Sequence, residues 1–210
     1  MRLEARAPGN VNLCLFVGPR RDDGRHEVVT LLESVSLADE LSLVIPDGAE
    51  PDVVHCPGVE GQNIVSRALD GLRARGWNGP PVRVEIAKRV PVAAGMGGDS
   101  ADAAAMLRLA EYLSPIASTE LLELAAGLGS DVPSQLAPGV ALGTGAGERV
   151  ERHQLLAPHA FVIVPLAHGL SAAEVYAEAD RLGLTRTAAD LEQLRDELTA
   201  ALVPGAELPA

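Results

Sequence analysis

Residues 82–113 have the sequence VRVEIAKRVPVAAGMGGDSADAAAMLRLAEYL, and this stretch decides the fold that we expect. Its first six residues alternate apolar and polar side chains, which predicts a β-strand over residues 82–87. A glycine-rich turn follows, and the alanine-rich run after it predicts a helix over residues 100–113 that Ser100 caps. A strand, a glycine-rich turn and a helix in this order are typical of phosphate binding, because glycines let the backbone approach an anion and the helix N-terminus attracts it.

The turn does not match the two most common nucleotide-binding signatures. It lacks the Gly-Lys-Ser/Thr end of a Walker loop, and it contains no Gly-x-Gly-x-x-Gly run. On composition alone, a tight strand-to-helix connection without any ligand is therefore also open.

The rest of the chain predicts short strands followed by helices. Apolar or alternating runs predict strands over residues 11–17, 28–36, 41–45 and, as a buried strand, 161–165. Helical spacing of apolar residues predicts helices over residues 63–75, 119–126, 172–181 and about 188–202, the first ending at Gly76. Strands first and strand–helix pairs later indicate the α+β class rather than a doubly wound parallel sheet.

Composition excludes several classes of protein. The chain has 210 residues, 47% of them hydrophobic and 22% charged, which is ordinary for a globular protein with a real core. A formal net charge of −12 argues against a nucleic-acid or anionic-membrane partner. The two cysteines form no disulfide framework, and we expect Cys14 to be a small core residue. Without an apolar leader or a long apolar run, the expected location is cytoplasmic.

Five segments carry a resemblance to a known family. They are APGNVNLCL (7–15), DGRHE (23–27), the turn with its following Asp-Ala-Ala (91–104), GLGSDVP (127–133) and GLSAAEVY (169–176). In this order and spacing they resemble the GHMP kinases, and within that family the branch that phosphorylates 4-diphosphocytidyl-2-C-methyl-D-erythritol. The resemblance covers residues 1 to about 205, and the five segments together are far more specific than any one of them.

The resemblance implies a fold and an activity. The fold is an α+β GHMP kinase fold, with a ribosomal S5 domain 2-like, ATP-binding N-terminal domain over residues 1–150. Residues 151–210 would begin a ferredoxin-like C-terminal domain that is incomplete in this chain. The implied activity is ATP-dependent, Mg²⁺-assisted phosphorylation of the 2-hydroxyl of a cytidine diphosphate-linked polyol, in non-mevalonate isoprenoid precursor biosynthesis. The implied partner is a small-molecule substrate, with no nucleic acid and no membrane, and the oligomeric state stays open.

The resemblance also assigns roles to individual residues. Asp131 would orient or deprotonate the attacking hydroxyl, although a turn residue before Val-Pro is the plainer interpretation. Asn12, Arg25 and His26 fall at substrate-binding positions, and Asn63 would lie near the nucleotide or simply cap a helix. The nucleotide phosphates would be held by Pro91, Val92, Ala93, Ala94, Gly95, Met96, Gly97, Gly98, Asp99, Ser100 and Ala101.

Three positions depart from the family pattern. Asn10 stands where the family has a catalytic lysine, and an amide cannot neutralise developing phosphate charge. Arg25 replaces a tyrosine that stacks on the cytosine ring, and a guanidinium can also stack. Asp99 replaces a glycine of the turn, where a carboxylate repels phosphates unless a cation compensates and fits badly if φ must be positive.

These departures leave two alternatives beside an active kinase for this substrate. One is a catalytically impaired GHMP-fold protein that binds a nucleotide or a partner. The other is a GHMP kinase for a different small alcohol. Whether Arg20, Arg21 or Arg25 supplies the charge missing at position 10 is also left open by the sequence.

Overall fold

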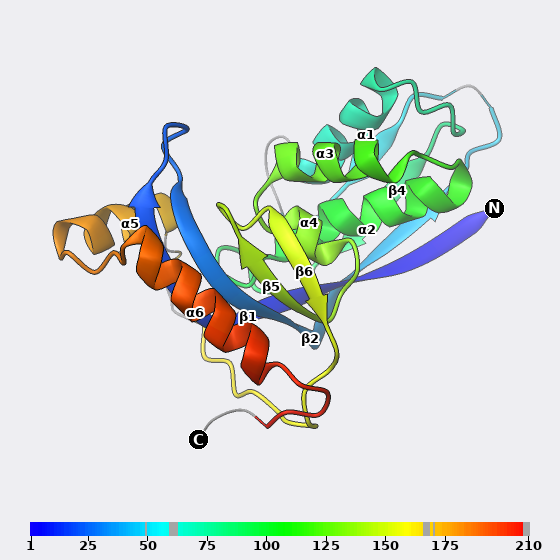
Figure 1. Ribbon diagram of the computed structural model, residues 1–210. Helices are drawn as coiled ribbons and strands as arrows, with labels where there is room; N and C mark the ends of the chain where they lie inside the picture. Colours follow the sequence, from blue (N-terminus) through cyan, green and yellow to red (C-terminus); the bar gives the residue numbers. More distant parts are fainter. Residues whose placement is uncertain (49, 59–62, 166–168, 170, 208–210) are drawn as a thin grey trace. The chain divides into compact units, whose positions relative to one another are not determined.

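The computed structural model describes residues 1–48, 50–58, 63–165, 169 and 171–207 (Figure 1). In chain order the elements are β1 (Arg2–Arg20), β2 (His26–Val44), β3 (Val53–His55), α1 (Ile64–Ala74), β4 (Arg83–Ala87), α2 (Gly98–Leu113), α3 (Ser118–Leu128), α4 (Val132–Gln135), β5 (Val140–Thr144), β6 (Arg149–His153), α5 (Ala172–Arg181) and α6 (Ala188–Ala201). They form two compact units. Unit 1 comprises Met1–Gly9, Val35–Pro91 and Gly97–Ala137, and unit 2 comprises Asn10–Ser34, Val92–Met96 and Pro138–Ala210. β1 and β2, which pair with each other, each continue from one unit into the other.

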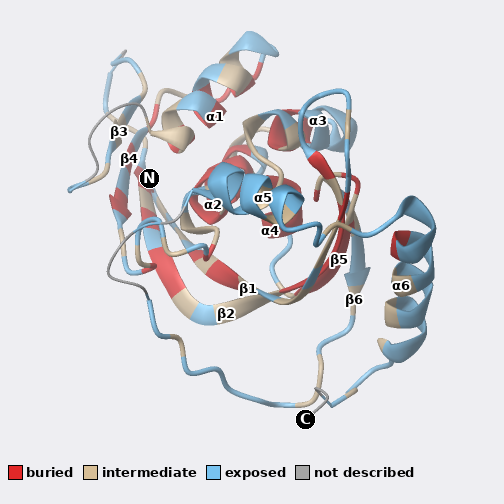
Figure 2. Cartoon of the chain, turned by 90° about the vertical axis from the view of Figure 1, so that its left-hand side faces the viewer, coloured by how far each residue is buried: buried red, intermediate tan, exposed pale blue. Residues whose placement is uncertain are grey.

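Unit 1 is built on β4. The strand pairs antiparallel with the C-terminal part of β2, from Glu40 opposite Ala87 to Val44 opposite Arg83, and it pairs parallel with β3. The alternation predicted from the sequence is present, since Val84 and Ile86 are buried whereas Arg83, Glu85 and Ala87 are exposed. The helices of unit 1 lie on one face of these strands (Figures 1 and 2).

The core of unit 1 is centred on α2. This helix is buried along most of its length, and Ala101, Ala103, Ala104 and Ala105 are all fully buried. Small side chains let α1, α3 and α4 approach it closely. The sequence therefore places an alanine-rich helix at the centre of a core that has few aromatic residues.

Unit 2 has a smaller core. The N-terminal part of β2 pairs antiparallel with β5, and β5 pairs antiparallel with β6. Val29, Leu142 and Leu191 form its buried cluster. α6 begins with a capping box between Thr187 and Asp190 and contributes Leu191, whereas α5 has no buried residue and is mostly pale blue in Figure 2.

The structure confirms the predicted helices and corrects the predicted strands. The runs expected as separate strands over residues 28–36 and 41–45 form one strand, β2, because Asp39 between them is buried and paired and makes no turn. The sequence did not predict β3, β5, β6 or the short helix α4, whose residues have too little apolar periodicity.

The strand expected over residues 161–165 is wrong. These residues form no strand in the described part of the chain, and Val162 is 94% exposed. An apolar run becomes a strand only when a neighbouring strand takes up its backbone hydrogen bonds, and none of the described strands does so here. Among the described residues, no helix is long and apolar enough to cross a membrane.

Candidate functional site

The glycine-rich turn joins β4 to α2 through backbone conformations that few residues adopt. Gly95 and Gly97 have φ values of 72° and 61°, and Ala93 is the only non-glycine residue with positive φ among those described, at 56°. Val92, Ala93 and Gly95 are exposed, so the turn presents backbone to its surroundings. This is the backbone that the sequence predicted for a phosphate-binding turn.

The N-terminus of α2 differs from the prediction in one respect. The helix begins at Gly98 and is capped by Gly97, which makes no side-chain hydrogen bond, so the prediction that Ser100 caps the helix is wrong. The Ala101 N–H donates to the Gly97 carbonyl at 2.9 Å, which places Ser100 inside the first turn. The preceding glycine takes the left-handed conformation and leaves the first N–H groups without a side-chain cap.

Asp99 is placed more favourably than the sequence suggested. It lies in the first turn of α2 with negative φ, so the expected backbone strain is absent at this residue. Its side chain is 69% exposed, and its carboxylate accepts a hydrogen bond from Lys88 Nζ at 3.2 Å. A carboxylate in the first turn also interacts favourably with the helix dipole. The repulsion expected between Asp99 and a phosphate is therefore partly offset by Lys88.

Asp131 lies in unit 1 at the start of α4. A Cβ placed on nearby Gly129 would be 3.7 Å from Ser100 Oγ, so the segment that holds Asp131 lies beside the first turn of α2. Burial raises the pKa of Asp131, and a hydrogen bond with the Ser130 side chain opposes this shift. The structure thus places the segment 129–131 beside the first turn of α2, which contains Ser100.

Asn63 caps a helix, which is the plainer of the two roles expected from the sequence. It is the N-cap of α1, and its Oδ1 accepts a hydrogen bond from the Val65 N–H at 2.7 Å. The same oxygen is therefore occupied, and a contact of Asn63 with the nucleotide stays a prediction.

In unit 2, Asn10 lies against the glycine-rich turn. Its backbone N–H donates to the Met96 carbonyl at 2.9 Å, and the residue is only 2% exposed. Among the described residues, none forms a hydrogen bond with its side-chain oxygen Oδ1. A buried acceptor without a partner is costly, so this oxygen is available to a donor supplied by a ligand.

Asn12 is exposed on the same strand. Its Nδ2 donates to Thr30 Oγ1 at 2.7 Å, and that hydroxyl donates in turn to the Cys14 carbonyl at 2.9 Å. Cys14 is half-buried, as expected for a small packing residue, and burial raises the pKa of its thiol.

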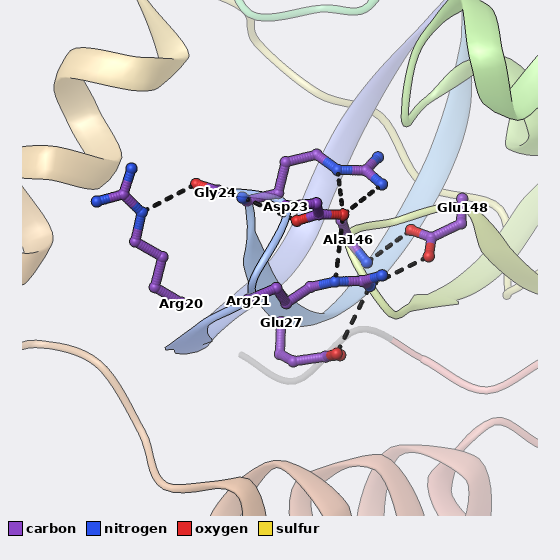
Figure 3. Close-up of polar contacts among 8 residues, drawn as sticks. Arg20, Arg21, Asp23, Gly24, Glu27, Ala146 and Glu148 are labelled. Carbon is purple, nitrogen blue, oxygen red and sulfur yellow. Dashed lines mark hydrogen bonds and ion pairs between the residues drawn. The ribbon is translucent and has the colours of Figure 1, made fainter.

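The three arginines near the β1–β2 turn all have partners within unit 2 (Figure 3). Arg25 bonds the Asp23 carboxylate through Nε at 3.1 Å and Nη2 at 2.8 Å, and Arg20 donates to the Gly24 carbonyl. Arg21 lies 3.2 Å from Glu148 and 3.5 Å from both Asp23 and Glu27. These contacts hold the turn and direct each guanidinium toward a carboxylate or carbonyl of that turn or of its neighbours.

His26 forms a cluster that the sequence did not predict. It is 7% exposed, and its ring stacks on Tyr176 of α5 with centroids 5.3 Å apart. His26 Nε2 also lies 3.0 Å and 3.1 Å from the two carboxylate oxygens of Asp180. Tyr176 belongs to the segment 169–176, of which Leu170 lies outside the described residues. The one signal in the sequence was the match of this segment to the family.

A groove of about 650 Å³ opens on the strand face of unit 1. Its lining includes Arg2, Glu4, His55 and Glu85, and none of the predicted site residues. Volume alone therefore does not identify the functional site here. In addition, no cluster of three or more metal-ligating side chains is present among the described residues.

Comparisons with known proteins agree with the geometry. The GHMP kinases N terminal domain matches residues 63–139. A 4-diphosphocytidyl-2-C-methyl-D-erythritol kinase of Streptomyces coelicolor is 41% identical over 191 residues, and one of Nocardioides sp. is 43% identical over 189 residues. The alignments cover 87% and 84% of this chain but 64% and 63% of those proteins, so the chain spans just under two thirds of the length of these curated relatives.

A solved structure shows the same likeness in three dimensions. A crystal structure of 4-(cytidine 5'-diphospho)-2C-methyl-D-erythritol kinase aligns with a TM-score of 0.60 at 31% identity, covering 97% of this chain and 85% of that one. The fold is that of a mixed α+β protein in which a glycine-rich turn connects β4 to α2. Its lineage follows from these relatives: the chain belongs to the GHMP kinase family. The α+β class and the GHMP kinase fold expected from the sequence are confirmed.

Proposed function

We propose that this chain supplies the ATP-binding part of a kinase that phosphorylates the 2-hydroxyl of 4-diphosphocytidyl-2-C-methyl-D-erythritol, in the non-mevalonate route to isoprenoid precursors. The observation that carries the proposal is the position of the segment that holds Asp131: its Gly129 lies beside Ser100, in the first turn of the helix that follows the glycine-rich turn. The names of the relatives at 41% and 43% identity support the choice of substrate.

The proposal divides the chain as the sequence suggested. Residues 1–150 would be the ATP-binding domain, which contains the whole of the matched family domain. Residues 151–210 would begin a second domain, and the exposure of Val162 and Val164 supports this, because apolar side chains of this kind are usually covered.

Phosphoryl transfer depends mostly on positioning and on neutralising charge. The N–H groups of the turn and the first turn of α2 would hold the nucleotide phosphates, with the Ser100 hydroxyl among them. Asp131 would accept the proton of the attacking hydroxyl, or orient that hydroxyl. Its raised pKa makes the ionised carboxylate a stronger base, provided that the working pH keeps it ionised.

Mg²⁺ fits this site with few protein ligands. The ion is usually held by one or two carboxylates together with substrate phosphates, so a dedicated protein cage is not required. The exposed Asp99 carboxylate and the Ser100 hydroxyl are the groups that would hold it. When bound, Mg²⁺ neutralises phosphate charge.

Several residues of unit 2 would contact the substrate. The unpaired Oδ1 of Asn10 would accept a hydrogen bond from a substrate hydroxyl, and the exposed Asn12 amide would contact the polyol. His26 and Tyr176 offer ring faces and edges to a cytosine base. Arg25 would stack on the base only after its ion pair with Asp23 opens. Both side chains are exposed, so opening this pair costs little free energy.

Two measurements test the proposal on the 210-residue chain. Isothermal titration calorimetry should detect ATP binding, and a coupled ADP-release assay should detect turnover with 4-diphosphocytidyl-2-C-methyl-D-erythritol, with the Streptomyces coelicolor protein as positive control. Inhibition by CDP would tie the acceptor to a cytidine diphosphate compound. Turnover of another small alcohol without CDP inhibition would overturn the substrate assignment, and absence of ATP binding would overturn the function as a whole.

A second candidate, an impaired member of the family that still binds nucleotide, is favoured by one observation. Position 10 holds an uncharged amide, and no cation contributes to the pKa of Asp131. Loss of one transition-state contact of this kind costs about 100- to 1000-fold in rate. If wild type binds ATP without turnover and Asn10→Lys turns over, the chain is an impaired kinase; if both turn over equally, this candidate is wrong.

A further inference from the structure

Lys88 is the only lysine of the sequence, against sixteen arginines. It directly follows β4, and its side chain is only 11% exposed. Its Nζ lies 2.7 Å from Asp39, 2.9 Å from Asp102 and 3.2 Å from Asp99. All four residues belong to unit 1, and together they flank the glycine-rich turn on its entry and exit sides.

Asp39 fixes the entry of the turn. This residue of β2 is fully buried, and its Oδ1 accepts hydrogen bonds from the backbone N–H groups of Arg89 at 2.5 Å and Val90 at 2.7 Å. Its other oxygen faces Lys88. Hydrogen bonds from N–H groups to an ionised acceptor are roughly twice as strong as neutral ones, so Asp39 holds the two residues before Pro91 firmly.

Asp102 fixes the exit of the turn from within α2. It is 1% exposed, and its Oδ2 accepts the hydrogen bond from Lys88. Close packing at Gly98 lets the lysine reach this position, because a Cβ there would lie 3.0 Å from Val90 Cγ1 and 3.3 Å from Lys88 Nζ. One ammonium group thus connects the strand side and the helix side of the turn.

Stability alone does not account for this cluster. Removing charges from water is costly, and well-packed apolar side chains in their place are often neutral or stabilising. Lysine also suits the position better than arginine, since a compact ammonium with three donors can contact three separate carboxylates whereas a planar guanidinium favours one or two. In a chain that uses arginine everywhere else, this choice indicates a geometric requirement.

The pKa shifts in the cluster agree with this geometry. Burial by itself would lower the pKa of Lys88, but its bonds to Asp39 and Asp102 more than offset this and raise it, so the ammonium persists. Burial raises the pKa of Asp102 to about 7 despite Lys88, because Asp39 and Asp99 lie nearby and one ammonium cannot neutralise three carboxylates.

We propose that Lys88, Asp39 and Asp102 are positioning residues that hold the two ends of the glycine-rich turn in its phosphate-binding shape. Lys88 in addition neutralises Asp99, so that the N-terminus of α2 still attracts a nucleotide phosphate. The inference about phosphate rests on the proposed ATP binding, whereas the inference about the shape of the turn does not. The two are therefore measured separately.

The shape of the turn is measured by hydrogen exchange without any ligand. Lys88→Met should speed exchange of the amides of residues 92–98, while Arg89→Met should not, because the Arg89 side chain only forms an exposed pair with Glu40. If Lys88→Met does not fold, Lys88→Met/Asp102→Asn serves instead. That variant removes one charge of each sign and leaves Asp39 with its two backbone partners.

The contribution of the phosphates to binding is measured by calorimetry with ATP, ADP and adenosine. Folded Lys88 variants should bind ATP and ADP about 10- to 100-fold more weakly than wild type, which is the usual effect of losing a group that orients a site. Adenosine affinity should not change. In titrations without Mg²⁺, Asp99→Asn added to Lys88→Met should restore part of the ATP affinity, because it removes a carboxylate whose charge Lys88 no longer offsets.

The outcomes separate this inference from the proposed function. Wild type that binds no ATP, with faster exchange in the Lys88 variants, overturns the function but supports the positioning of the turn. Unchanged exchange with unchanged ATP affinity overturns the positioning and leaves the function standing. Equal weakening of ATP and adenosine shows a merely structural role for Lys88 and also overturns the positioning.

Discussion

Replacing Asp102 with asparagine should remove a pH dependence from the free energy of unfolding. Asp102 is 1% exposed, and burial raises its pKa to about 7 from the ordinary value of 3.8. Because the pKa is higher in the folded state than in the unfolded one, the folded protein keeps this proton between about pH 4 and pH 7 while the unfolded chain releases it. Its contribution to stability is therefore complete at low pH and is lost as the pH rises toward 7.

The magnitude follows from the two pKa values. A tenfold change in the protonation equilibrium corresponds to about 1.4 kcal/mol. The difference between a pKa of 3.8 in the unfolded chain and about 7 in the folded protein therefore amounts to about 4 kcal/mol at most between pH 4 and pH 7. The raised pKa of Lys88 adds no slope in this window, because the ammonium is protonated throughout. Other carboxyls titrate there as well, so the quantity to compare is the difference between wild type and variant at each pH.

Urea denaturation of wild type and Asp102→Asn at pH 4.5, 5.5, 6.5 and 7.5 measures this difference. The variant should gain on wild type steadily with pH, by several kcal/mol over the range. Asp131→Asn is a comparison variant, since burial also raises the pKa of Asp131 and the same direction of change is expected there. A difference that is independent of pH would refute the reasoning. A wild type that instead gains on the variant would show that the ion pair with Lys88 outweighs burial.

Three further predictions concern Asp131 and the cores of the two units. Asp131→Asn should lower kcat by about 100- to 10,000-fold with ATP affinity unchanged, as measured by the ADP-release assay and calorimetry. Gly18→Ala should destabilise unit 2 by about 1–3 kcal/mol in denaturant unfolding, since the new Cβ would lie 2.3 Å from Leu191 Cδ1 and displace the buried contact of α6. Leu107→Ala should cost about 2–5 kcal/mol, because this side chain of α2 is fully buried; a loss below 1 kcal/mol would contradict the packing described for unit 1.

The sequence predicted helices better than strands, for a physical reason. A helix satisfies its own backbone, so the spacing of apolar residues in α1 and the alanine-rich composition of α2 are sufficient evidence for them. A strand depends on a neighbour, and residues 161–165 have the composition of a strand without a described partner. Conversely, β5 and β6 pair well although their own sequences are unremarkable.

The sequence predicted the glycine-rich backbone of the candidate site but not the side chains that hold it in place. Glycines in the turn and Asp131 in its motif were visible because their roles depend on local sequence. The contacts of Lys88 with Asp39 and Asp102 join residues 49 and 14 positions apart, and that of His26 with Asp180 joins residues 154 apart. No spacing rule reveals such pairs, although a single lysine among sixteen arginines was a signal that could have been followed.

The three departures from the family pattern do not weigh equally once the structure is known. Asp99 has a negative φ and a lysine partner, so it imposes no strain on the turn and Lys88 offsets part of its charge. Arg25 is paired with Asp23 at an exposed site, where little free energy opposes its release. Asn10 differs, because Arg20 and Arg21 have partners elsewhere and, among the described residues, nothing forms a hydrogen bond with its buried Oδ1. A loss of activity relative to the family should therefore trace to position 10, and Asn10→Lys is the substitution that reverses it.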